Sequence, residues 1–196
     1  MNVQLPPPAS IDSMLEGFFV GTSKSIALLY SNGLYAHLLV VIYSAIDTMG
    51  LLDAPPSQID ATGPGFKSWV RKYLLGDPRV NFNDADLWAA RCAVLHTFTS
   101  ESRLSREGQA KELQYFGGDK ESEFAKQFVT ITPTLHGGKH VPVHFEDLCE
   151  IFFEGIKRFA LDLQQNCVAD PAYEARLRKI LQTHYIPPTP ADAAAT

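Results

Sequence analysis

The sequence has little cysteine, and this excludes a disulfide-stabilised framework. Only 3 of its 196 residues are cysteine, whereas small disulfide scaffolds are rich in it. Cys92, Cys149 and Cys167 are odd in number, far apart in the chain and flanked by apolar residues. We therefore expect buried free thiols, which are typical of a protein in a reducing compartment such as the cytoplasm.

Several catalytic and ligand-binding motifs are missing from the sequence. It has no Walker loop, dinucleotide-binding glycine fingerprint, Cys-x-x-Cys pair, His-Glu-x-x-His or Gly-x-Ser-x-Gly, which argues against the enzyme classes built on them. His136, His140 and His144 are candidate zinc ligands. On an extended strand, however, His140 and His144 would lie about 13 Å apart, too far for one ion. We therefore expect no metal and no cofactor.

Positive charge is also scarce. Seventeen Lys and Arg residues stand against 22 Asp and Glu residues, which gives a net charge of −5. A dedicated duplex-DNA-binding domain is usually basic, so this balance argues against one. Local basic clusters do occur over residues 67–79 and 103–111. Each cluster is either a solvated face or a contact for phosphate groups.

Charged residues are absent from residues 25–46, a stretch nearly long enough to span a membrane. The sequence Ser31-Asn32-Gly33 interrupts this stretch. The remaining apolar segment has about the length of a buried core helix, so we expect no contact with a membrane.

Residues with apolar side chains are common enough to exclude a disordered chain, since 45% of the sequence is hydrophobic. We expect a single helical domain over residues 11–185. A flexible proline-rich arm over 1–10 precedes it, and a disordered tail over 186–196 follows it. Apolar residues repeat at helical spacing in several segments. The predicted helices span residues 12–29, 33–49, 66–75, 85–97, 146–165 and 171–184.

Between the fourth and fifth of these helices the pattern changes and favours β structure. Glycine pairs at 117–118 and 137–138 mark turns. The predicted strands span residues 112–116, 127–132 and 141–144. The fold class that follows is mainly α, a helical bundle with a small antiparallel β-hairpin insertion over about 112–144.

Arg91 and His96 form an Arg-x4-His pattern on the predicted helix over 85–97. A histidine titrates near neutral pH and can move a proton to or from an RNA hydroxyl. An arginine offers a planar set of donors to a phosphate whose charge grows in the transition state. Residues five apart on a helix differ by about 140°, so a symmetric dimer would bring the two side-chain types together better than one chain. The structural alternative is an ion-paired arginine and a histidine stabilised by the helix dipole.

Asp47 is the first charged residue after the neutral stretch, on the predicted helix over 33–49. A carboxylate on an apolar helix needs a partner, and Arg91 or His96 would serve. Alternatively, Asp47 lies at the helix end in water.

The segment Asp86–Arg106 and the upstream segment Tyr43–Gly50 resemble an uncharacterised bacterial helical family that looks like a divergent branch of the HEPN superfamily. The resemblance covers about residues 35–116. It implies an HEPN-like helical bundle that is usually dimeric, and in many members a metal-independent ribonuclease of toxin–antitoxin, CRISPR or other defence systems. Other members have lost activity. Active members often carry a polar residue after the arginine, and here that residue is Cys92.

On this resemblance the chain binds or cleaves RNA and forms a homodimer. His96 would be the general acid and base, Arg91 would stabilise the phosphorane, and Asp47 would orient one of them. Arg103 and Arg106 would hold RNA phosphates, or else they pair with nearby glutamates. The alternative is a non-catalytic helical interaction or scaffold protein with a protein partner, which the acidic net charge and Cys92 favour.

Overall fold

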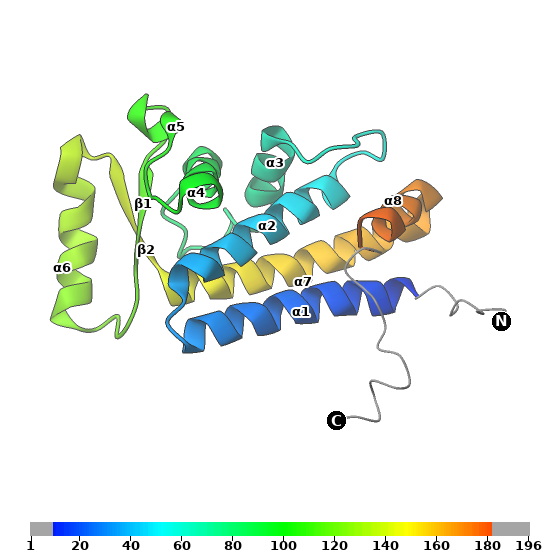
Figure 1. The fold of residues 1–196 in the computed structure, drawn as a ribbon, viewed down its shortest axis with the longest axis horizontal. Helices are drawn as coiled ribbons and strands as arrows, with labels where there is room; N and C mark the ends of the chain where they lie inside the picture. The colour runs from blue at the N-terminus through cyan, green and yellow to red at the C-terminus, as the bar shows by residue number, and fades with distance from the viewer. Residues whose placement is uncertain (1–9, 182–196) are drawn as a thin grey trace.

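Three long helices lie side by side and form the body of the molecule (Figure 1). The computed structural model describes residues 10–181, and in it these helices are α1 (Ile11–Ser31), α2 (Tyr35–Asp53) and α7 (Phe145–Ala169). The last helix, α8 (Pro171–Leu181), packs against all three. The predicted tail, and all of the predicted arm except residue 10, lie outside the described residues.

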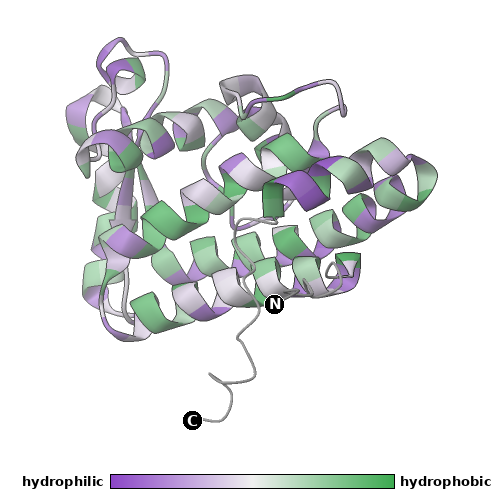
Figure 2. Cartoon of the chain, turned by 45° about the vertical axis from the view of Figure 1, so that its right-hand side comes forward, coloured by the Kyte–Doolittle hydropathy of each residue, from purple (hydrophilic) through white to green (hydrophobic). Residues whose placement is uncertain are grey.

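The other side of α2 is covered by α3 (Gly63–Tyr73) and α4 (Asp84–Thr97), and α3 also reaches α7. The molecule is thus mainly helical, as the apolar periodicity predicts. Figure 2 shows hydrophobic residues recurring along the long helices. Aromatic rings join α3 to α7 inside the bundle. The centre of the Trp69 ring of α3 lies 6.0 Å from that of Phe159 on α7.

Helix α2 is the central element of the core. Five of its side chains have no solvent exposure: Leu38, Ile42, Tyr43, Ile46 and Met49. Within residues 10–181 it is the one helix long and apolar enough to cross a membrane by length and composition, and half of its apolar window is buried inside the fold. Its hydrophobicity is therefore accounted for by packing.

Helix α2 does not end at residue 49, where the sequence-based prediction ended it, but continues through Gly50 to Asp53. A Cβ atom on Gly50 would lie 3.0 Å from the backbone carbonyl of Gly65. The missing side chain therefore lets the start of α3 approach α2 closely, which is a packing role rather than a helix stop.

Side-chain caps determine where several helices begin. Ser10 accepts a hydrogen bond from the Ser13 amide at 3.1 Å and starts α1. Asn83 caps α4, and the Asp86 carboxylate accepts the Asn83 amide proton in return, which completes a capping box. The helices predicted over 12–29 and 85–97 start within one residue of the observed ones, because Ser and Asn satisfy the free amides of a first helical turn.

The small sheet is parallel, so the predicted antiparallel hairpin is wrong. Strand β1 (Glu112–Phe116) pairs with β2 (His140–His144) over their full lengths, with Glu112 opposite His140. Parallel neighbours need a crossover, which a tight glycine turn cannot provide. The crossover here consists of α6 (Glu123–Ile131) and a 3-10 segment, η1 (Thr132–Gly137).

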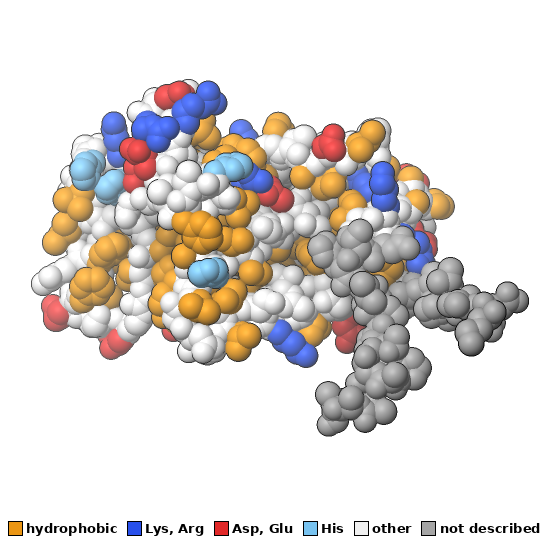
Figure 3. Space-filling model, viewed as in Figure 1, with side chains coloured by type: hydrophobic (Ala, Val, Ile, Leu, Met, Phe, Trp, Pro, Cys, Tyr) orange, Lys and Arg blue, Asp and Glu red, His pale blue; other side chains and the backbone are white. Residues whose placement is uncertain are grey.

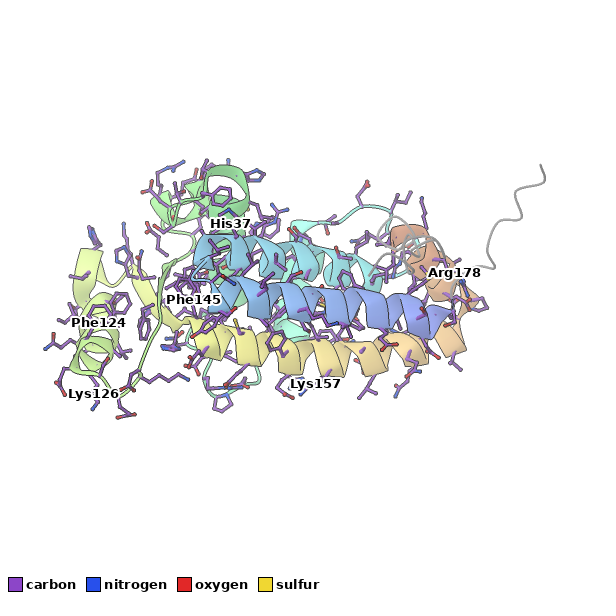
Figure 4. All side chains as sticks on the ribbon, turned by 60° about the horizontal axis from the view of Figure 1, so that its bottom comes forward. His37, Phe124, Lys126, Phe145, Lys157 and Arg178 are labelled. Atoms are coloured by element: carbon purple, nitrogen blue, oxygen red, sulfur yellow. The ribbon has the colours of Figure 1, made fainter. Side chains whose placement is uncertain are left out.

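Helix α6 takes the place of the strand predicted over 127–132. Ser122 caps it by accepting the Ala125 amide proton. The rings of Phe124 and Phe128 lie 5.8 Å apart on this helix, and Phe128 packs 4.8 Å from Phe116 of β1. Figure 4 shows Phe124 on this helix, at the far side of the strands from the long helices. The cap and this aromatic packing outweigh the β propensity of the local sequence.

All three cysteines are free thiols, as predicted from their number. Cys149 and Cys167 are buried, whereas Cys92 is half-buried. Burial raises the pKa of the Cys149 thiol to about 12, which makes it a poor nucleophile.

Candidate functional site

Arg91 of α4 and Asp47 of α2 meet where the two helices pack together. The Nε and Nη2 atoms of Arg91 both donate to Asp47 Oδ2, at 2.9 and 2.7 Å. The sequence-based expectation that Asp47 needs a cationic partner is thus met by Arg91. Because two donors converge on one oxygen, the plane of the guanidinium is fixed.

A contact with an aromatic ring also restrains the Arg91 side chain. Its guanidinium carbon lies 5.0 Å from the centre of the Trp88 ring, one turn earlier on α4. The Arg91 and Asp47 side chains are 20% and 17% exposed. The pair is therefore largely buried but open to solvent on one side. A guanidinium has five N–H donors, and Asp47 uses two of them, so three are left for another acceptor.

His96 is exposed in the last turn of the same helix. Within residues 10–181 it makes no hydrogen bond or ion pair with Arg91. The helix ends directly afterwards, because Phe98 adopts a left-handed conformation with φ of 53°. The Phe98 ring is exposed and lies 5.7 Å from the ring of His37 on α2. Within one chain, Arg91 and His96 therefore lie on the same helix but do not interact with each other among the described residues.

Arg103 and Arg106 lie on a short helix, α5 (Arg103–Arg106), that follows α4. Arg106 donates to Glu101 at 3.2 Å, and Arg103 lies 3.9 Å from Glu107. The structure therefore contains the glutamate pairs that the sequence offered as the alternative to phosphate binding. Both arginines are nevertheless exposed, and exposed pairs of this kind break at little cost.

The three histidines near the sheet have different surroundings. His144 is buried, where its ring contacts the Gly118 carbonyl at 2.9 Å and accepts the Glu146 amide proton at the start of α7. His136 and His140 lie together, with ring centres 4.8 Å apart. No group of three His, Cys, Asp or Glu side chains within residues 10–181 is arranged to hold a metal ion.

A polar groove beside α5 combines Arg106, which the sequence-based prediction assigned to RNA phosphates, with residues that it did not assign to a phosphate site. Its volume is 680 Å³, within the usual range of ligand pockets. The groove is lined by Glu101, Ser105, Arg106, Glu112, His136, Lys139 and His140. Figure 3 shows Lys, Arg and His side chains gathered on this side of the molecule, over the region of α5. The run His136-Gly-Gly-Lys-His140 is the signal that points to it, since glycine pairs bring flanking side chains together.

Comparisons of the chain with protein-family models, with curated proteins and with solved structures gave no match.

Proposed function

We propose that this chain is an HEPN-like RNA-binding domain that cleaves single-stranded RNA without a metal ion. The observation that carries the proposal is the Arg91 guanidinium, which Asp47 fixes at the surface with three N–H donors to spare. His96, an exposed group able to transfer protons, follows on the same helix. The helical body and the sequence resemblance support the same proposal.

The chemistry needs only arginine and histidine side chains of these two kinds and the RNA. A neutral His96 takes the proton of the ribose 2′-hydroxyl, whose oxygen attacks the adjacent phosphorus. The bond to the 5′-oxygen breaks, and a protonated histidine gives that oxygen its proton. Arg91 donates to the phosphoryl oxygens, where negative charge accumulates in the transition state. The products are a 2′,3′-cyclic phosphate and a 5′-hydroxyl, with no net consumption of protons.

A homodimer is part of this proposal. Because Arg91 and His96 differ by about 140° around α4, one chain supplies them poorly to one phosphate. A two-fold axis beside the end of α4 would bring two arginines and two histidines to a shared cleft. The exposed Phe98 ring, 60% accessible at this end of the helix, is available for such a contact.

The direct test is cleavage of single-stranded RNA in the presence of EDTA. His96→Ala should abolish cleavage, while Lys157→Ala should retain it, because Lys157 is an exposed residue of α7 with no role in the proposed step. Size-exclusion chromatography with light scattering should give the mass of two chains. Cleavage that survives His96→Ala, or no cleavage by the unaltered protein, would refute the catalytic proposal.

A second candidate is a non-catalytic interaction or scaffold protein, and one observation favours it. Arg91 is engaged by Asp47 and covered by Trp88, which is what a structural ion pair requires. Cys92, where active relatives often have a polar residue, favours the same candidate. In either role, the free thiols suit a cytoplasmic protein.

A further inference from the structure

We propose that the polar groove beside α5 is a binding site for a phosphate group, carried by a nucleotide or by RNA. This site is separate from the Arg91–Asp47 pair and involves no cleavage. Four elements build it: the loop before α5, α5 itself, the start of β1, and the link from η1 into β2. The proposal goes beyond RNA cleavage, because it holds for a protein that binds phosphate and performs no chemistry.

The groove contains several donors that no acidic side chain occupies. Within residues 10–181 the Lys139 ammonium has no ion pair or hydrogen bond. Arg106 shares its Nη1 atom with Glu101, which leaves its other donors free. Among the described residues the His136 imidazole makes no hydrogen bond or ion pair, and its ring centre lies 4.8 Å from that of His140. A phosphate placed here would therefore accept hydrogen bonds from Lys139, Arg106 and an imidazole together.

The backbone orients these side chains. His136, Gly137 and Gly138 adopt positive φ angles of 48°, 69° and 83° in succession. A left-handed conformation is rare for a residue with a side chain, and here it turns the chain so that His136 lies against His140. Strained residues of this kind concentrate at ligand sites.

The charged side chains of the groove balance one another. Arg106 from α5 and Lys139 beside β2 are balanced by Glu101 from the loop and Glu112 from β1. Glu112 Oε2 lies 3.7 Å from His140 Nε2. These two positive and two negative side chains sum to zero, so the groove has no excess of negative charge to repel a phosphate.

The test compares three phosphate probes on the full-length chain: inorganic phosphate, adenosine monophosphate and a fluorescein-labelled single-stranded oligoribonucleotide. Lys139→Ala should weaken binding roughly fivefold and reduce the slope of log K against log salt by about 0.7. The matched control is Lys157→Ala, which removes the same charge from the lower side of α7 (Figure 4) and should change binding less than about twofold. His136→Asn is compatible with the left-handed backbone at this position and should weaken phosphate binding, because it removes an imidazole donor.

The three probes separate the outcomes. If Lys139→Ala weakens binding of the oligonucleotide, the groove is an RNA contact. If it weakens binding of adenosine monophosphate alone, the ligand of the groove is a nucleotide. In the second case the groove proposal stands for a nucleotide, and the RNA-cleavage proposal is decided separately by the effect of His96→Ala on cleavage. If His96→Ala abolishes cleavage but Lys139→Ala leaves every probe unaffected, the RNA proposal stands and the groove proposal is overturned. No binding of any probe also overturns it.

Discussion

Replacing Asp47 by alanine should destabilise the fold, because it removes the partner of a largely buried arginine. Two hydrogen bonds, at 2.9 and 2.7 Å, are lost. The Arg91 side chain, 20% exposed, keeps its charge but loses its counter-ion. Its position against Trp88 leaves the charge only partly hydrated.

The magnitude lies between two limits. Removing one partner of a fully buried pair costs about 3–5 kcal/mol, and an exposed pair contributes about 0–1 kcal/mol. Since the Asp47–Arg91 pair is about four-fifths buried, we expect a loss of about 2 kcal/mol in the free energy of unfolding. For a chain of this size, that loss lowers Tm by about 4–8 °C. Asp47→Asn keeps one oxygen acceptor and should cost about half as much.

Urea denaturation followed by circular dichroism measures this loss. The control is Glu154→Ala, which breaks the exposed pair between Lys157 and Glu154, with side chains 69% and 48% exposed. It should cost less than about 0.5 kcal/mol. A double-mutant cycle with Arg91→Ala isolates the pairwise contribution. If Asp47→Ala costs no more than Glu154→Ala, the burial argument is wrong.

Three further predictions concern other parts of the molecule. Gly155→Ala places a Cβ atom 2.7 Å from Leu74 Cδ2 and should cost about 2 kcal/mol in urea denaturation through overpacking; an unchanged midpoint would contradict this. Burial raises the pKa of Cys149 to about 12, so thiol labelling at pH 8 should be far slower in native than in urea-unfolded protein, and equal rates would count against it. Hydrogen bonds from Arg79 lower the pKa of Asp77 from 3.8 to about 2. This stabilisation is present above the unfolded-state pKa and disappears as the pH falls from 4 to 2, so Asp77→Asn should flatten that part of the stability profile.

The long helices are predictable from the sequence because their signals are local. Apolar residues at helical spacing identify α7, and the structure extends it only to Phe145 and Ala169. The Asn83 cap identifies the start of α4. In both cases the residues that form the helix and the residues that indicate it are the same, so long-range contacts do not change the outcome.

The region between β1 and β2 is not predictable in this way. Residues 127–132 have β-branched and aromatic side chains, yet they form the end of α6 and the start of η1. The deciding contact is between Phe128 and Phe116, which are distant in sequence. The direction of β2 follows from that choice, because a helix between two strands allows them to pair in parallel.

One part of the candidate site is predictable from the sequence and another part is not. The Arg91–Asp47 contact is predictable because a carboxylate on an apolar helix requires a cation. The groove at His136 and Lys139 depends on α5 and on a left-handed turn. Neither α5 nor the left-handed turn has a periodic sequence signal. The residues of the groove therefore become neighbours only when the chain folds, and the sequence does not reveal them.

The same substitution at Asp47 separates the two candidate functions, because stability and RNA binding respond to different parts of the pair. Asp47→Asn lowers stability in either case, since it weakens a largely buried contact. If Arg91 binds phosphate, loss of the neighbouring negative charge should leave oligonucleotide affinity equal or higher, while a less well oriented guanidinium slows cleavage. If Arg91 is purely structural, affinity should follow the fraction of folded protein and nothing else. Affinity that rises while stability falls therefore cannot come from a scaffold.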